Sequence, residues 1–238
     1  MNGPPMHASA MVAMPASNTN NVGKTRPSSS NLANPAKRRM IAKNIVIKPS
    51  DYVKSAFKAN GFDIDTVKAA AMKTFSEPTE DMLDSYTSEL LATVRKNNME
   101  KLRQIHAEGK LVNSSNKFGE SLLHLSCRRS FTEMTKFLIH DVKVDLNIRD
   151  DYFRTPLHDA CWTPTPNFEI VELLIKEAPE HLLLEDVRGF TPFDYVRNDH
   201  WKQWLRFLWE RRDQLRPKDR KLPDASATMD AEPSPTSS

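Results

Sequence analysis

Hydrophobic positions in the second half of the chain recur with the spacing of amphipathic helices. Three blocks carry apolar residues three and four positions apart, and each ends in an apolar triplet, at residues 137–139, 173–175 and 207–209. This spacing places apolar side chains on one face of a helix. The pattern therefore predicts a mostly α-helical fold in which each helix buries one side.

A second pattern precedes each of these blocks. Residues 116–124, 150–158 and 186–194 read NKFGESLLH, DDYFRTPLH and DVRGFTPFD, so their starts lie 34 and 36 residues apart. Ankyrin repeats have a period of about 33 residues. This part of the chain resembles the ankyrin repeat family. The resemblance implies an α-solenoid of helix pairs with short β-turn fingers, and a role in binding a protein partner.

About four such units are expected, over residues 79–115, 116–149, 150–185 and 186–216. Together they would form an ankyrin repeat domain over residues 79–216, with each unit holding a finger, an inner helix and an outer helix. Both end units are atypical, because polar residues stand where the other units have apolar or small ones. Polar substitutions at the ends of a stack keep it soluble.

The start of each inner helix has a physical explanation in the sequence. Thr155 can cap the helix, and Pro156 fits the first turn, where an amide hydrogen would lack a partner. Ser121 and Thr191 offer the same cap in the neighbouring units. Phe153 departs from the pattern, because it occupies a slot that glycine holds in the other two fingers. A bulky residue there would be strained by about 1 kcal/mol or more.

The segments before the repeats have their own pattern. Residues 49–78 are interpreted as a helical lead-in, with Asp63 or Asp65 capping its second helix. Thr79 and the acids after it predict a further helix that places Leu83, Tyr86, Leu90 and Val94 on one face.

Both ends of the chain have the composition of disordered segments. Residues 1–48 and 217–238 lack a periodic apolar face and are expected to be disordered, because they cannot bury enough surface to offset their ordering entropy. The net charge of +3 also hides a basic arm, since residues 1–50 hold seven Lys or Arg and no acid.

Three interpretations of this arm stay open. Residues 35–43 form a basic cluster of the nuclear-import or nucleic-acid type. The acid-free arm also meets part of the description of an organelle transit peptide. The third interpretation is a solvated tail. A cytoplasmic or nuclear location is predicted, and no apolar run approaches the roughly 18 residues that a membrane helix needs.

The histidines and cysteines suggest a metal site. His124 and Cys127 are three residues apart, as are His158 and Cys161, and all four are zinc-ligand types. The competing hypothesis is that both histidines hold turns by hydrogen bonds while the cysteines are buried and unpaired. We favour the second hypothesis and expect no cofactor. An enzyme is not expected either, because no phosphate loop or activated nucleophile is visible.

The resemblance directs attention to the finger tips and inner-helix ends, which would form a concave binding face on a monomer. These positions mix aromatic residues with arginines, the types that dominate interface hot spots. The alternative for Phe118, Tyr152 and Phe190 is that they pack the fingers together. The predicted partner-binding residues are Lys117, Phe118, Glu120, Arg128, Arg129, Asp151, Tyr152, Arg154, Trp162, Thr163, Val187, Arg188, Phe190, Asn198 and Asp199.

Overall fold

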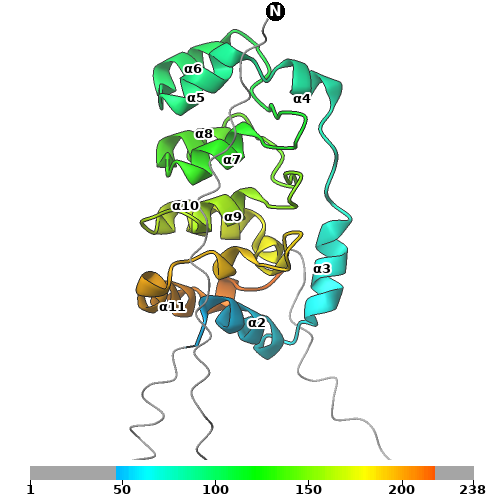
Figure 1. The fold of residues 1–238 in the computed structure, drawn as a ribbon, viewed down its shortest axis with the longest axis vertical. Helices are drawn as coiled ribbons and strands as arrows, with labels where there is room; N and C mark the ends of the chain where they lie inside the picture. The colour runs from blue at the N-terminus through cyan, green and yellow to red at the C-terminus, as the bar shows by residue number, and fades with distance from the viewer. Residues whose placement is uncertain (1–46, 218–238) are drawn as a thin grey trace, which may run out of the picture. The chain divides into compact units, whose positions relative to one another are not determined.

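The computed structural model describes residues 47–217, which form a row of helical layers (Figure 1). Its α-helices are α2 (Pro49–Ala59), α3 (Ile64–Met72), α4 (Glu80–Asp84), α5 (Ser88–Arg95), α6 (Met99–Ala107), α7 (Leu122–Arg128), α8 (Thr132–His140), α9 (Pro156–Cys161), α10 (Phe168–Glu177) and α11 (Trp201–Glu210). Short 3₁₀ turns are η2 (Pro179–Leu183), η3 (Pro192–Asp194), η4 (Asn198–His200) and η5 (Arg212–Gln214). Within residues 47–217 there is no β-strand, only an isolated bridge between Ser115 and Ser121.

The helices pair in chain order into stacked layers, α5 with α6, α7 with α8, and α9 with α10. The last layer differs, because the 3₁₀ turn η3 stands where an inner α-helix was expected, beside α11. The predicted fold class, a mostly helical solenoid of helix pairs, is confirmed. Except for Ile47, Lys48 and Pro217, the predicted disordered arm and tail lie outside the described residues.

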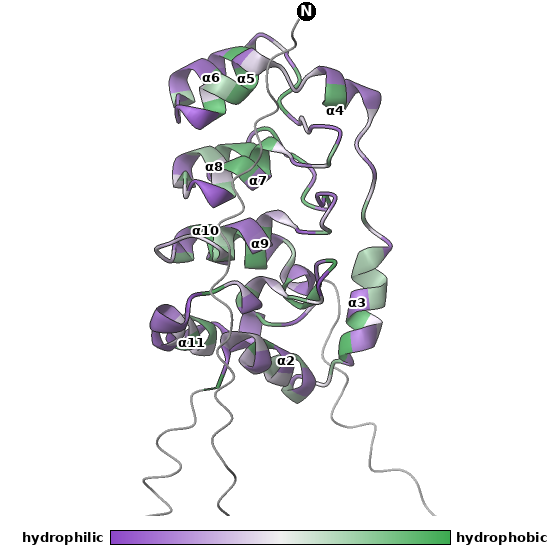
Figure 2. Ribbon diagram, in the orientation of Figure 1, coloured by the Kyte–Doolittle hydropathy of each residue, from purple (hydrophilic) through white to green (hydrophobic). Residues whose placement is uncertain are grey.

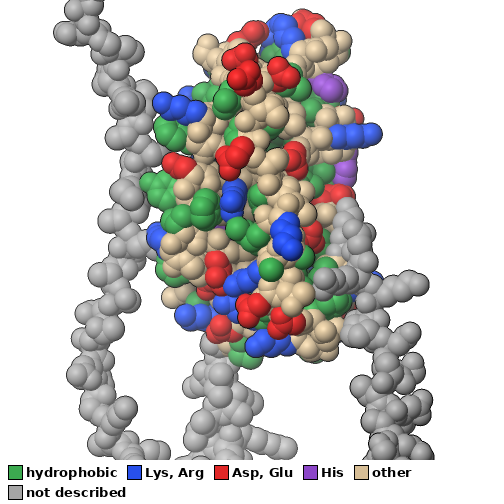
Figure 3. Space-filling model, turned by 90° about the vertical axis from the view of Figure 1, so that its right-hand side faces the viewer, with side chains coloured by type: hydrophobic (Ala, Val, Ile, Leu, Met, Phe, Trp, Pro, Cys, Tyr) green, Lys and Arg blue, Asp and Glu red, His purple; other side chains and the backbone are tan. Residues whose placement is uncertain are grey.

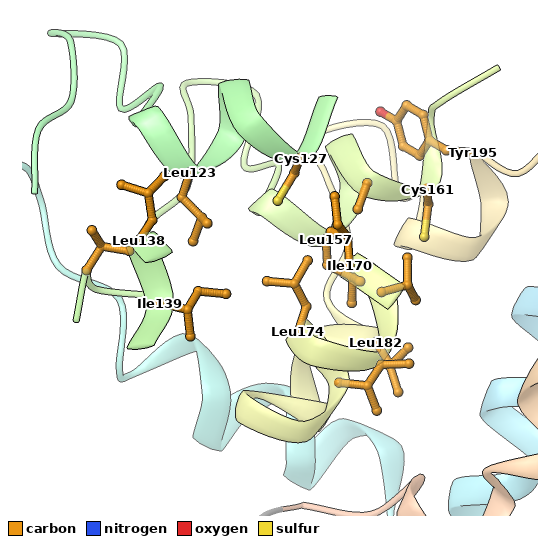
Figure 4. Packing of buried hydrophobic residues seen from close by; sticks show 14 of the residues in the cluster. Leu123, Cys127, Leu138, Ile139, Leu157, Cys161, Ile170, Leu174, Leu182 and Tyr195 are labelled. Carbon is orange, nitrogen blue, oxygen red and sulfur yellow. The ribbon is translucent and has the colours of Figure 1, made fainter. Parts of the chain in front are cut away.

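The core lies between successive layers (Figures 2 and 4). Leu123, Leu157 and Phe193 are fully buried at equivalent positions of three consecutive units. Figure 4 labels the first two of them. Their outer-helix partners are also buried, namely Met134, Leu138, Ile170, Leu174, Trp204 and Leu208. Burying one such side chain contributes about 1.5–3 kcal/mol. Because each layer covers the apolar side of the next, the stack forms one continuous core.

The predicted helix after Thr79 is interrupted. Thr79 caps α4 through Met82 N at 3.3 Å, as expected, but α4 ends at Asp84, with Ser85 as its C-cap. Thr87 then caps α5 by accepting a hydrogen bond from Leu90 N at 3.3 Å. The prediction of a single helix was therefore wrong. Leu83 is partly exposed and does not share a buried face with Leu90.

The lead-in helices occupy a position that no sequence pattern indicated. Helix α2 packs on α11 and η3, at the opposite end of the row from α4, α5 and α6 (Figure 1). Asp63, one of the two predicted caps, caps α3 through Thr66 N at 2.8 Å. Helix α3 lies beside η2, where Lys68 Nζ is 2.6 Å from Glu185 Oε1.

The chain then returns along the side of the stack to reach the first unit. Phe75 stacks on the buried His181 ring at 5.4 Å, and Ser76 N donates to Asn147 O at 3.5 Å. The lead-in therefore closes the last layer and also runs the length of the repeats. No helix of residues 47–217 is long and apolar enough to span a bilayer.

Candidate functional site

The fingers are built by one device that is repeated three times. Asn116, Asp150 and Asp186 each place Oδ1 where it accepts from the backbone amides two and four residues later, at 2.8–3.1 Å. Side chains of this type close tight turns on themselves. Each finger therefore has the same shape.

Neighbouring fingers are joined through their backbones. Asp151 N donates to Phe118 O at 2.8 Å, and Val187 N donates to Tyr152 O at 3.0 Å. Gly119 lies so close to the next finger that a Cβ atom would stand 2.2 Å from Arg149 O, and its φ is 75°. Phe153 adopts φ 62° at the equivalent position, as the strain prediction requires, and Arg149 covers its ring at 4.2 Å.

The motif histidines link each unit to the next. His124 Nδ1 lies 2.9 Å from Ser121 Oγ, and its Nε2 lies 3.0 Å from Arg154 O of the following finger. His158 does the same between Thr155 and Phe190 O, at 3.0 and 3.2 Å. Burial lowers the pKa of both imidazoles to about 4. Both rings are therefore neutral at physiological pH.

The hypothesis that these histidines hold turns is confirmed. Both ring nitrogens of His124 and His158 already have hydrogen-bond partners within the protein. Cys127 and Cys161 are buried and unpaired (Figure 4), and burial raises the pKa of both thiols. Among residues 47–217, no three His, Cys, Asp or Glu residues are grouped as metal ligands would be. The arrangement gives no support to the zinc hypothesis.

Several predicted partner-binding residues lie on the exposed finger surface. The side chains of Phe118, Tyr152, Trp162 and Phe190 are between 42% and 53% exposed, so these rings are not simply packed between fingers. Figure 3 views the finger and α3 side, where hydrophobic side chains lie among charged ones. Lys117, Arg129, Asp151, Val187, Asn198 and Asp199 are exposed as well. Thr163 is buried and bonds Ala160 O and Thr165 O, which makes it a structural residue.

The predicted arginines are held in place by the fingers. Arg154 Nε donates to the buried Asp150 Oδ2 at 2.8 Å, and its guanidinium covers the Tyr152 ring at 5.1 Å. Arg188 pairs with Asp186 at 3.2 Å and covers the Phe190 ring at 5.1 Å. Such pairing leaves the guanidinium groups partly exposed but fixed.

The charged side chains of the first finger are held in the same way. Arg128 pairs with Glu120, and the Lys117 ammonium lies 5.1 Å from the centre of the Phe118 ring. In all three fingers, therefore, a charged side chain contacts an acid or an aromatic ring of the same unit.

Tyr195 is a site residue that sequence reasoning missed. Its hydroxyl donates to Asp186 Oδ2 at 2.5 Å and accepts from Arg188 Nη2 at 2.5 Å. Its ring lies 6.3 Å from both Trp162 and Phe190. We call Trp162, Phe190 and Tyr195 the aromatic patch.

Asp159 is the second missed residue, three positions before Trp162 on the same face of α9. It is 2% exposed, and Oδ1 has no hydrogen-bond partner among the described residues. Burial raises its pKa to about 6, although Arg128 and Arg154 oppose the shift. The equivalent residues are Leu125 and Tyr195, and an acid at an otherwise uncharged position was the signal available in the sequence.

A row of helix pairs whose fingers are joined edge to edge defines the protein as a repeat solenoid. A family model for ankyrin repeats, in three copies, matches residues 90–186. Residues 90–186 of this chain therefore carry ankyrin repeats.

Relatives match the chain over short stretches. The SMC5-SMC6 complex localization factor protein 1 of Homo sapiens is 35% identical over 83 residues, which are 34% of this chain and 8% of that protein. Its Bos taurus counterpart is 34% identical over 83 residues, which are again 34% of this chain and 8% of that protein. A Caenorhabditis elegans protein named as a glutaminase is 32% identical over 59 residues, or 25% of this chain and 10% of that protein. The chain thus spans about a tenth or less of these relatives.

Proposed function

We propose that this chain is a non-catalytic adaptor that binds a protein partner through its fingers and inner-helix ends, the concave face of the stack. Ankyrin repeats are protein-interaction modules, and this coarse role follows from the family match. The observation that carries the proposal is the aromatic patch, with exposed Trp162 and Phe190 rings beside fixed arginines. A fixed surface costs little ordering entropy on binding.

Asp159 adds specificity to this face. A buried carboxylate oxygen without a hydrogen-bond partner destabilises the fold. A partner that displaces the side chains covering Asp159 and supplies a hydrogen-bond donor, such as a backbone amide or hydroxyl, would satisfy it. A lysine of the partner would be repelled by Arg128 and Arg154, so a neutral donor fits better. We therefore expect a partner segment with an apolar side chain next to a neutral donor.

An affinity capture from the native extract with the full chain tests the proposal. Trp162→Ala should reduce capture of the partner by at least about tenfold, since truncating a hot spot costs about 2 kcal/mol or more. Tyr152→Ala and Arg154→Ala extend the test along the fingers. Trp209→Ala is the matched control, because Trp209 is 59% exposed but lies on α11. Partners lost equally with both tryptophan variants, or with neither, would contradict the proposed face.

A nuclear role is the second candidate. The human and bovine relatives are named as localization factors of the SMC5-SMC6 complex, and residues 35–43 of this chain are basic. In this proposal the arm directs import or contacts nucleic acid while the repeats bind the partner. Deleting residues 1–48 should then abolish nuclear accumulation of a fluorescent fusion and retention on DNA or RNA. Unchanged accumulation and retention would dismiss it.

A further inference from the structure

The two ends of the stack are chemically unlike. At the first-unit end, α4, α5 and α6 surround a hollow of about 660 Å³. Leu90 and Ile105 lie in this hollow, and Leu111 at its edge is 43% exposed. We call it the end pocket. Leu90 and Ile105 form its buried floor, and Leu111 is left exposed because no further layer lies over this end within residues 47–217.

The rim of the end pocket is acidic. Asp81, Asp84 and Glu89 line it together with Lys110, whose ammonium already pairs with Glu108 at 2.9 Å. Neither Asp81 nor Asp84 has an ion-pair partner in the described part of the chain. Residues 74–94 contain five acids and no Lys or Arg. Acidic side chains gather accordingly near the top of Figure 3, over the first unit.

The chain itself contains a segment with the complementary pattern. Residues 35–43, which we call the arm segment, read PAKRRMIAK, so Met40 and Ile41 lie between Lys37, Arg38 and Arg39 on one side and Lys43 on the other. An apolar pair flanked by cations fits an apolar hollow with an anionic rim. We propose that the arm segment of a second copy of this chain docks in the end pocket.

Distance decides between the chain's own arm and that of another copy. The described chain begins at Ile47, beside α2, and α2 lies at the opposite end of the row from the pocket (Figure 1). Four layer spacings separate α2 from α5 and α6, which is roughly 32–40 Å at 8–10 Å per spacing. The six residues from Ile41 to Ile47 span at most about 22 Å when fully extended. The arm segment of the same chain therefore does not reach.

Charge at the α2 end favours the same arrangement. Residues 48–60 hold three Lys and one acid, and residues 198–217 hold five Lys or Arg and three acids. This basic end would approach the acidic end of the next copy. Contacts between two different surfaces that do not close into a ring extend into an open row. The sequence alone predicted a monomer, and the unlike ends instead lead to reversible head-to-tail association.

Sedimentation velocity of the full chain tests this inference. The weight-average mass should rise with concentration at low salt, and association should weaken about tenfold or more between about 50 mM and about 500 mM salt, because the contact is partly ionic. An arm variant (Lys37→Gln, Arg38→Gln, Arg39→Gln) and a pocket variant (Asp81→Asn, Asp84→Asn) should each remain monomeric. Lys24→Gln with Arg26→Gln is the matched control and should associate like the unmodified chain.

Mixing the two inactive variants makes the test specific. The pocket variant keeps a basic arm and the arm variant keeps an acidic pocket, so the mixture should form a one-to-one dimer and nothing longer. A full chain that stays monomeric at every concentration, or a mixture that does not dimerise, would overturn the inference. Trp162→Ala should leave association unchanged, so this result is independent of the proposed partner-binding face.

Discussion

The two units that are followed by another finger differ from the last unit at the position that contacts the next element of the stack. His124 and His158 each bind a carbonyl oxygen of the following finger. The last unit has Asp194 at this slot, which accepts from Thr191 Oγ1 at 2.7 Å. Burial alone would raise the pKa of Asp194, but hydrogen bonds from Ser50 of α2 and from Thr191 lower it. An acceptor replaces a donor at this slot because the neighbouring element, α2, presents the Ser50 hydroxyl where the other units face a carbonyl oxygen.

The same comparison applies to packing. The inner layers are filled mainly by aliphatic side chains, whereas the last layer has aromatic ones around Trp204. Its ring lies 4.8 Å from Phe168, 5.3 Å from Phe193 and 5.8 Å from Phe207. Large rings fill the space left where a 3₁₀ turn replaces an inner helix. Helix α2 then packs on α11 and η3 at this end of the stack.

The largest expected effect comes from removing this aromatic centre. Trp204→Ala should lower the free energy of unfolding by about 3–5 kcal/mol, because it opens a cavity in a fully buried site. Urea denaturation followed by circular dichroism measures the change. Trp209→Ala, on the same helix but exposed, should change stability by no more than about 0.5 kcal/mol. Similar losses for both tryptophans would show that α11 does not cap the core as described.

Acid should lower the stability of the fold through its buried histidines, a sensitivity that the Asp194 slot does not share. The pKa of His124, His158 and His181 is about 4 in the fold, because burial disfavours the charged ring, and about 6.5 when unfolded. The unfolded chain binds more protons between these values, so stability is fully present above pH 6.5 and falls as the pH drops toward 4. Each histidine contributes up to about 3 kcal/mol to this loss.

Denaturant melts between pH 7.5 and pH 4.5 measure how the free energy of unfolding changes with pH. Asp159 has the opposite sign, since its raised pKa favours the proton in the fold, and it offsets part of the loss. His158→Gln should flatten the profile, whereas His140→Gln, on the exposed end of α8, should not. A profile that His158→Gln leaves unchanged would mean that this ring is not the titrating group.

Two glycines at equivalent positions of two fingers test the close contact between neighbouring fingers. Gly119 and Gly189 have φ of 75° and 79°, but only Gly119 abuts a following finger. Gly189→Ala should cost about 1 kcal/mol, the penalty of a left-handed residue. Gly119→Ala should cost at least about 2–3 kcal/mol, because its Cβ would also displace the Arg149 carbonyl. Thermal denaturation of the pair compares them, and equal losses would contradict the close finger contact.

Repetition explains which features could be predicted. The caps and the buried columns recur in three copies and the turn-holding histidines in two, so the repeated pattern was enough to indicate them. The contact of each histidine with the following finger was not predicted. The position of α2 recurs nowhere, and it depends on long-range packing against α11 that no local spacing encodes. The break before α5 was detectable in principle, since Thr87 is a capping residue. The sequence directed attention to exposed positions, so it did not indicate Tyr195 and Asp159, which are buried beside the candidate face.

The smallest expected effect concerns Asp159, the one charged residue in a column otherwise filled by Leu125 and Tyr195. Its pKa of about 6 means that the ionised carboxylate destabilises the fold at neutral pH. Asp159→Asn should therefore raise the free energy of unfolding at pH 7 by about 1–2 kcal/mol, and the gain should vanish as the pH falls from 6 toward 4. Denaturant melts at pH 7 and pH 4.5 measure both values. If the acid is retained for binding, the same variant should capture less of the partner although it is more stable. A variant that is less stable but captures the partner as well as the unmodified chain would show that Asp159 stabilises the fold by balancing the charges of Arg128 and Arg154.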